Sequence, residues 1–195
     1  MYKVNEIFYS IQGEGYNAGC AAVFVRFSGC NLNCPFCDTE HDSGILMSAD
    51  DICAEIRKYP ANLVVLTGGE PSLFVDEALC NAIHAIGKRI AMETNGTRAI
   101  SLPVDYITCS PKFEFCDSQE SQLRIGRIDE LKVVYTGNND MSLYDDITAS
   151  HYYLQPCDTG NAEETKKIVR QTLDYILQHP KWTLSLQLHK ILNVR

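Results

Sequence analysis

The sequence lacks both an excess of positive charge and any long apolar run. Its 17 Lys and Arg residues are outnumbered by 25 Asp and Glu residues, which gives a formal net charge of -8. Nucleic-acid binding draws most of its affinity from Lys and Arg that neutralise phosphates, so we expect no nucleic-acid partner. No segment has the length of a membrane span, and the first residues form neither a basic start nor an apolar signal core. We therefore expect no membrane association and a cytoplasmic location.

Linkers and repeats are also missing. No Pro-, Gly- or Ser-rich stretch, long charge block or fixed-period repeat interrupts the 195 residues. A chain of this length with 45% hydrophobic residues can bury one substantial core. Residues 1–195 are therefore expected to form a single domain.

Cysteine, by contrast, is abundant, and the spacing of three cysteines is informative. The run from Cys30 to Cys37 reads Cys-Asn-Leu-Asn-Cys-Pro-Phe-Cys, with the middle thiol at Cys34. An iron-sulfur cube has four irons, so three thiolates hold three corners and leave the last iron open to another ligand. This spacing predicts chemistry at a 4Fe-4S cluster.

The other six of the nine cysteines are expected to be reduced thiols, because an odd count in a cytoplasmic protein fits disulfide pairing poorly. Cys53 and Cys80 fall in helical patterns and Cys109 in a strand pattern, where a free Cys is usually a small buried hydrophobe. The pattern assigns no role to Cys20, Cys116 and Cys157.

Zinc is the alternative metal. His41 lies four residues after Cys37 and would complete a Cys3His set. A structural zinc site usually stabilises a very small module, whereas this loop interrupts a substantial chain, so the cluster is the stronger interpretation. A noncatalytic iron-sulfur or zinc module that senses redox state is the corresponding alternative function.

The apolar pattern predicts alternating strands and helices. Strands are expected at 22–27, 63–67, 89–93, 105–109, 131–135, 152–155 and 182–190, and helices after Ser48 up to Pro60, over 78–86 and over about 163–178. Such alternation indicates an α/β fold, either a doubly wound sheet or an incomplete barrel. The chain is short for a complete eight-unit barrel, so we favour a truncated, open parallel (β/α) partial barrel.

Polar motifs follow the carboxyl ends of several predicted strands. The cysteine loop, Gly68-Gly69-Glu70, Thr94-Asn95-Gly96 and Ser110-Pro111-Lys112 all have this placement, so we expect them to meet at one rim. The expected last strand, 182–190, alternates apolar and polar residues. Its polar face is either solvated or lines the cavity, and in the second case Gln187 and His189 would contact substrate.

The spacing of the three cysteines resembles the radical S-adenosylmethionine (SAM) superfamily. The resemblance implies that SAM chelates the open iron and that an electron from the reduced cluster cleaves its sulfonium. The resulting 5'-deoxyadenosyl radical then abstracts a hydrogen from the substrate. Phe36 matches an aromatic residue that usually lies near the adenine.

Further motifs, in this order, resemble the 7-carboxy-7-deazaguanine synthase family over nearly the whole chain. They are Ile11-Gln-Gly-Glu-Gly15, Arg26, Cys37-Asp-Thr39, Thr67-Gly-Gly-Glu-Pro71, Glu93-Thr-Asn-Gly96, Ser110-Pro-Lys112, Gln155-Pro-Cys-Asp158 and Gln187-Leu-His-Lys190. Each motif alone is weak, but their combined order is specific. Leu188 and Cys157 depart from the usual pattern, where Thr and a bulkier apolar residue are more common.

This second resemblance implies a reaction of queuosine biosynthesis. The substrate would be 6-carboxy-5,6,7,8-tetrahydropterin, which loses ammonia as its ring contracts to a carboxylated deazapurine, while SAM is regenerated. The resemblance also implies a homodimer and a reductant such as flavodoxin or ferredoxin. An activase that makes a glycyl radical on a protein partner is the alternative enzyme, because such activases are also short and share the cysteine spacing.

The resemblance assigns roles residue by residue. Catalytic roles fall to Cys30, Cys34, Cys37, Glu14 and Arg26, with the three cysteines as cluster ligands. Contacts to SAM or the cluster fall to Phe36, Asp38, Gly69, Glu70, Asn95, Ser110, Lys112, Gln155 and Asp158. Substrate contacts fall to Ile11, Gln12, Gly13, Glu14, Arg26, Thr67, His189 and Arg195. The hydroxyl of Thr39 would bind Mg²⁺ together with the substrate carboxylate and waters.

The residues alone leave simpler readings open. Arg26 could form an ordinary ion pair, Gln12 and Glu14 could belong to a simple tight turn, and Thr39 could cap a loop.

Overall fold

A computed structural model describes residues 1–37 and 39–195. In this part of the chain nine strands form one sheet, in the order β3-β1-β2-β4-β5-β6-β7-β8-β9. The strands are β1 Tyr2–Ile11, β2 Ala21–Phe27, β3 Ile45–Met47, β4 Leu63–Gly68, β5 Arg89–Thr94, β6 Tyr106–Cys109, β7 Glu130–Tyr135, β8 His151–Pro156 and β9 Thr183–Leu184. The helices are α1 Ala49–Ile56, α2 Glu77–Ala85, α3 Ala162–Gln178 and α4 Leu188–Leu192, with short 3-10 turns at Pro71–Leu73 and Met141–Tyr144.

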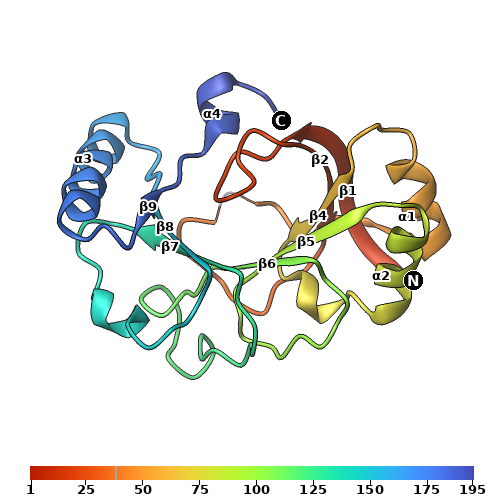
Figure 1. The fold of residues 1–195 in the computed structure, drawn as a ribbon, viewed down its shortest axis with the longest axis horizontal. Coiled ribbons are helices and arrows are strands. Elements are labelled where there is room, and N and C mark those ends of the chain that lie inside the picture. Colours follow the sequence, from red (N-terminus) through yellow and green to blue (C-terminus); the bar gives the residue numbers. More distant parts are fainter. Residues whose placement is uncertain (38) are drawn as a thin grey trace.

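The sheet is open and mostly parallel. From β2 to β9 each neighbouring pair is parallel, while β1 is antiparallel to both β2 and β3. Helices α1 and α2 lie outside one end of the sheet and α3 outside the other, and α4 with the C-terminus lies between the two ends (Figure 1). The predicted α/β partial barrel is confirmed.

Most predicted strands and helices are confirmed. The central strands could be predicted because both of their faces are covered. β4 has four consecutive buried residues and β7 is buried along its whole length, which produces the apolar runs seen in the sequence. α1 begins after Ser48, whose hydroxyl accepts a hydrogen bond from the Asp51 N–H at 3.1 Å, and the Asp51 carboxylate accepts one from the Ser48 backbone N–H at 2.9 Å. This helix ends at Ile56 rather than continuing to Pro60.

The predicted strand over 182–190 is wrong. Only Thr183–Leu184 pair as β9, and the chain then leaves the sheet and forms α4. The Leu188 N–H bonds to the Gly13 carbonyl at 3.1 Å, so a contact with a distant loop replaces the sheet ladder. Ser185, expected on a polar face, is buried. The alternation of apolar and polar residues over 182–190 therefore spans two short elements, β9 and the start of α4.

The strands β1 and β3 were not predicted from the sequence. β1 and β3 form the antiparallel edge, and β1 contains polar residues and an irregular register between Val4 and Glu6 that breaks the alternation of buried and exposed side chains. Such an edge has no clean period in the sequence.

The two largest apolar clusters among the described residues pack against the sheet. The larger packs α1 and α2 against β1, β2, β4 and β5, and the smaller surrounds β7 and β8 next to α3. Cys53, Cys80 and Cys109 are buried, as expected. No helix among the described residues combines the length and the hydropathy of a membrane span.

Candidate active site

One cavity of about 960 Å³ collects the polar motifs at the carboxyl ends of the parallel strands. The predicted site residues that line it are Ile11, Gln12, Gly13, Glu14, Arg26, Cys30, Cys34, Phe36, Cys37, Thr39, Thr67, Gly69, Asn95, Ser110, Lys112, Gln155, Asp158, His189 and Arg195. Asp38 lies outside the described residues, and Glu70 lies behind the cavity wall. The expected convergence on one rim is therefore seen in the described part of the chain.

The cysteine loop enters the cavity directly after β2. Gly69, after β4, touches this loop closely: a Cβ on Gly69 would lie 2.0 Å from the Gly29 carbonyl oxygen, so only glycine allows the approach. The Glu70 N–H also bonds to that carbonyl oxygen at 2.9 Å. The β4 turn and the cysteine loop are thus held together by their backbones.

The three thiols of the cysteine loop all line the cavity. Burial raises the pKa of Cys30, and burial together with the neighbouring Cys116 thiol, whose sulfur lies 3.7 Å away, raises the pKa of Cys34 to about 12. Such thiols keep their protons until a metal replaces them. Three sulfur donors on one cavity-lining loop fit an iron-sulfur cluster.

His41 also lines the cavity. Within residues 1–37 and 39–195, no three His, Cys, Asp or Glu side chains are gathered closely enough to hold a metal ion, and this applies to the three cysteines alone as well as to a Cys3His set. The choice of an iron-sulfur cluster over zinc therefore rests on the spacing of the cysteines.

The loops after β5 and β6 present polar groups next to the cysteine loop. The Lys112 ammonium donates to the Ser110 hydroxyl at 2.7 Å, and burial lowers the pKa of Lys112. The Asn95 amide donates to the Asn31 side chain, within the cysteine loop, at 3.1 Å. These groups could bind the amino acid part of a ligand held at the loop.

Glu70, which was expected to bind the cofactor, is enclosed by protein groups in this structure. Its side chain is fully buried and accepts hydrogen bonds from the Thr94 hydroxyl at 2.7 Å and from the N–H groups of Asn95 at 2.7 Å and Ser72 at 3.0 Å. These protein donors use both carboxylate oxygens. Glu70 therefore positions the Thr94–Asn95 turn instead of facing the cavity.

β8, the loop that follows it and α4 form another part of the cavity wall. Asp158 pairs with the Lys190 ammonium at 2.8 Å, and the hydrogen bond from Lys190 lowers the pKa of Asp158. Gln155 is buried and accepts a hydrogen bond from the Ser185 hydroxyl at 2.9 Å. Phe36 packs edge-on against Phe115, with ring centroids 4.6 Å apart.

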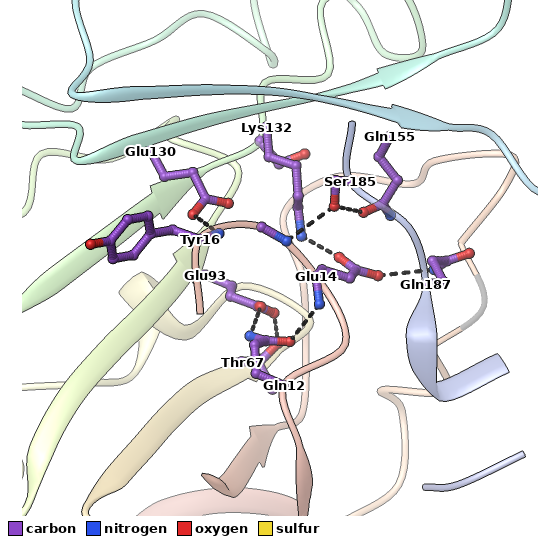
Figure 2. A network of polar contacts seen from close by, with 12 residues as sticks. Gln12, Glu14, Tyr16, Thr67, Glu93, Glu130, Lys132, Gln155, Ser185 and Gln187 are labelled. Carbon is purple, nitrogen blue, oxygen red and sulfur yellow. Dashed lines mark hydrogen bonds and ion pairs between the residues drawn. The ribbon is translucent and has the colours of Figure 1, made fainter. Parts of the chain in front are cut away.

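A network of polar side chains also contributes to the lining of the cavity (Figure 2). The Lys132 ammonium forms an ion pair with one oxygen of Glu14, and the Gln187 amide donates to the other oxygen at 3.0 Å. Glu93 accepts from the Gln12 amide at 2.9 Å and from the Thr67 hydroxyl at 2.8 Å. The network therefore offers carboxylate and amide groups in fixed orientations.

Electrostatics keep Glu14 ionised. Burial alone would raise its pKa, but the charge and hydrogen bond of Lys132, with the hydrogen bond from Gln187, outweigh burial and lower it. For Lys132 burial acts in the opposite sense, and the charges of Glu14 and Glu93 keep its pKa raised.

Glu130 anchors the turn after β1. Its carboxylate accepts from the Tyr16 N–H at 2.9 Å and the Tyr106 hydroxyl at 3.1 Å, and burial raises its pKa. Gly15, at φ +63°, leaves room for this carboxylate, because a Cβ there would lie 1.9 Å from a Glu130 oxygen.

Two arginine side chains, Arg26 and Arg195, form a cationic part of the cavity wall. Arg26 donates to Glu6 at 2.9 Å and approaches the Thr39 hydroxyl at 3.5 Å, and Arg195 pairs with the other oxygen of Glu6. Both guanidinium groups lie over the Phe8 ring. Arg26 therefore forms an ordinary ion pair with Glu6 and also lines the cavity.

Gly13 and His189 meet although the strand predicted around His189 is wrong. A Cβ on Gly13 would lie 2.7 Å from the His189 Nδ1 atom, so the glycine lets α4 approach the turn after β1. Gln187, at the start of the same helix, also lines the cavity.

Sequence reasoning assigned no role to Glu6, Glu93 and Lys132, which all line the cavity. Lys132 did leave a signal, because a Lys inside a strand that is otherwise apolar is rarely buried unless it is paired.

The chain is similar to several known proteins over most of its length. Residues 24–107 match the model of the Radical SAM superfamily. The chain is 52% identical, over the full length of both, to the 7-carboxy-7-deazaguanine synthase of Bacteroides thetaiotaomicron, and 36% identical to that of Haemophilus influenzae over 99% of this chain and 94% of the relative. A crystal structure of QueE from Escherichia coli aligns with a TM-score of 0.75 and 27% identity, covering 95% of this chain and 93% of the other.

Proposed function

Since the chain belongs to the 7-carboxy-7-deazaguanine synthase family of radical SAM enzymes, we propose that it converts 6-carboxy-5,6,7,8-tetrahydropterin to 7-carboxy-7-deazaguanine with loss of ammonia. The chain is a radical SAM enzyme of 7-deazapurine and queuosine biosynthesis. One observation carries the choice of substrate: a single cavity joins the three-cysteine loop to a buried network of carboxylates and amides. When bound, the 4Fe-4S cluster and SAM supply the radical that abstracts hydrogen.

The buried network suits the pyrimidine edge of a pterin. That edge presents N–H donors and a carbonyl acceptor, and Glu14, Glu93 and the Gln12 amide offer acceptors and a donor in return. Gln12 is held at both ends, because its nitrogen bonds to Glu93 and its oxygen accepts from the Glu14 N–H at 3.2 Å. A fixed array of this kind keeps a reactive substrate in one orientation.

The cationic end suits the substrate carboxylate. Arg26 and Arg195 lie on the same wall, and a guanidinium can pair with a carboxylate through two parallel hydrogen bonds. Glu6 holds both groups, so the carboxylate of the substrate would compete with Glu6 for them. We assign the orientation of the substrate carboxylate to this wall.

We assign Thr39 to magnesium binding. Its hydroxyl lines the cavity next to Arg26, where a substrate carboxylate would lie. One neutral oxygen binds Mg²⁺ weakly, so the substrate carboxylate and waters would fill the remaining positions. The role of the residue is then to place a cation that orients the substrate.

The cofactor side holds SAM in this proposal. Ser110 and Lys112 bind its carboxylate, Gly69 lets its amino group approach the backbone, and Asn95, Gln155, Asp158 and Phe36 line the region for the adenosine. Asp38 stays a prediction from the family resemblance. One domain over residues 1–195 and a cytoplasmic location stay proposals from the sequence, and a homodimer and a flavodoxin or ferredoxin as reductant stay proposals from the family resemblance.

Anaerobic turnover tests the proposal. Reconstituted protein is incubated with SAM, dithionite, Mg²⁺ and carboxytetrahydropterin, and the products are identified by mass spectrometry. We expect a deazapurine and ammonia in equal amounts, with SAM recovered. Cleavage of SAM that ignores the pterin, with no deazapurine formed, would contradict the proposal and favour the glycyl-radical activase.

A further inference from the structure

Lys132 is a buried cation surrounded by carboxylates. It lies on β7 with 7% of its surface exposed, and its ammonium pairs with Glu14 from the turn after β1. The charges of Glu93 on β5 and Glu130 on β7 also act on it. Burying a cation carries a desolvation penalty, which the neighbouring carboxylates offset here. This distinguishes Lys132 from a surface lysine.

Glu14 is the partner best placed to use this charge. It lines the cavity, its side chain is only 15% exposed, and both of its oxygens are held by protein groups, Lys132 on one and Gln187 on the other. Figure 2 shows these partners approaching Glu14 from different segments of the chain. The carboxylate can therefore neither rotate freely nor lose its partner without cost.

We propose that Lys132 is a positioning residue that keeps Glu14 ionised and aimed at the substrate. This inference rests on the proposed function, because it takes Glu14 as a substrate contact. Lys132 acts through Glu14 and needs no direct contact with the reacting atoms. An ionised Glu14 accepts two hydrogen bonds from neighbouring N–H donors of a ligand, whereas a protonated one would offer a donor in the wrong place.

The groups around Glu14 determine how the pair responds to pH. Lys132 faces it from β7 and His189 acts on it from α4, while Gln187 contributes a neutral amide. Beyond these, Glu93 from β5 and Glu130 from β7 act on Lys132, and the charge of Lys132 acts on Lys112 in the loop after β6. Without Lys132, burial would favour the protonated form of Glu14.

The test measures substrate affinity, not turnover, on the reconstituted enzyme with SAM bound and no reductant. Lys132→Met removes the charge and keeps an unbranched chain, and we expect it to raise the Kd for carboxytetrahydropterin roughly 30-fold at neutral pH. The loss should grow as the pH falls from about 8 to 6, while the wild type shows no such trend from Glu14. Lys58→Met removes a surface lysine that pairs with Glu55 and should leave Kd and pH profile unchanged.

A double-mutant cycle distinguishes positioning from a general structural role. If Lys132 acts through Glu14, Lys132→Met should add less than about 3-fold to the Kd of Glu14→Gln. Full additivity of the two losses, or a Lys132→Met variant with the wild-type Kd and pH profile, would overturn the inference. Lys132→Arg, which keeps the charge, should recover most of the affinity.

If Lys132→Met does not fold, the wild type and Glu14→Gln carry the test. Both are measured in a His189→Gln background, which removes the charge that acts on Glu14 from α4. Their Kd values should then change in parallel between about pH 5.5 and 8, because an ionised Glu14 takes up no proton there. A transition present when Glu14 is intact and absent from Glu14→Gln would contradict the inference. Failure of the proposed function looks different, because the wild type would then bind no carboxytetrahydropterin at any pH.

Discussion

The two sides of the cavity are organised differently. On the substrate side Glu14, Glu93 and Glu130 each accept hydrogen bonds from at least two protein donors. On the cofactor side the thiols belong to one loop, with Cys37 exposed and Cys34 in contact with Cys116. The substrate side is thus part of the folded framework, whereas the cysteine loop is an addition at the end of β2.

This difference predicts how substitutions will act. Changes in the buried network should lower stability and substrate affinity together, because its groups hold strands and loops to one another. Changes in the cysteine loop should remove activity and leave the fold intact.

The largest effect is expected for Cys34→Ala. Loss of one of three sulfur ligands should abolish the cluster and lower activity by about 1,000-fold or more, with an unchanged thermal transition of the cluster-free protein. Iron content and visible absorbance measure the cluster, and circular dichroism measures the fold. Cys116→Ala is the matched control and should keep the cluster. A Cys34→Ala protein with full iron content would show that Cys34 is not a cluster ligand.

Thr39→Ala should have the next largest effect. We expect the cluster to remain and activity to fall by about 100-fold, with the stimulation by Mg²⁺ lost, because the variant lacks the proposed magnesium ligand. Thr39→Ser keeps a hydroxyl and should retain most activity. Activity that Mg²⁺ stimulates equally in Thr39→Ala and in the wild type would refute the magnesium assignment.

Glu70→Gln should act at the boundary of the two sides. It replaces a buried carboxylate that holds the Thr94–Asn95 turn, so we expect a loss of about 2 kcal/mol in unfolding free energy, typical of hydrogen bonds to a charged group. SAM affinity should fall with it, because Asn95 shifts. Denaturant unfolding measures the first and equilibrium binding the second. Glu77→Gln, at an exposed position of α2, is the control, and equal stability of the two variants would contradict the positioning role.

The smallest effect is expected for the half-exposed pair of Asp158 and Lys190. The pKa of Asp158 is lowered in the folded protein, so its contribution to stability is present above the unfolded pKa and is lost as pH falls through the folded pKa. Solvent screening limits this contribution to about 0.5 kcal/mol. Asp158→Asn should therefore destabilise the protein slightly at neutral pH and not at all near pH 2. An equal loss at both pH values would show that the ion pair is not the cause.

The fold could be predicted where burial leaves a simple pattern. Strands β4 to β8 are apolar because both faces are covered, and the cap of α1 at Ser48 is a local signal. β1 and α4 could not be predicted, because the irregular register near Val4 hides the first and the contact between Leu188 and Gly13 forms the second. Both depend on segments far apart in the sequence.

The site shows the same division. Residues in loops after strand ends, such as Gly69 and Lys112, could be predicted because parallel strands deliver their carboxyl ends to one rim. Glu93 and Lys132 could not, because they lie inside strands and their partners Gln12 and Glu14 are 81 and 118 residues away in the chain. Glu70 was assigned to the cofactor by its motif, yet its contacts lie behind the cavity wall.

The central claim is that the cysteine loop and the buried carboxylate network serve two ligands in one cavity. Turnover of carboxytetrahydropterin that carries deuterium on the carbons of its reduced ring tests this most directly. We expect deuterium in the recovered SAM, because hydrogen must pass between the two bound molecules and back. Deazapurine formed with no deuterium in SAM or in 5'-deoxyadenosine would contradict the account.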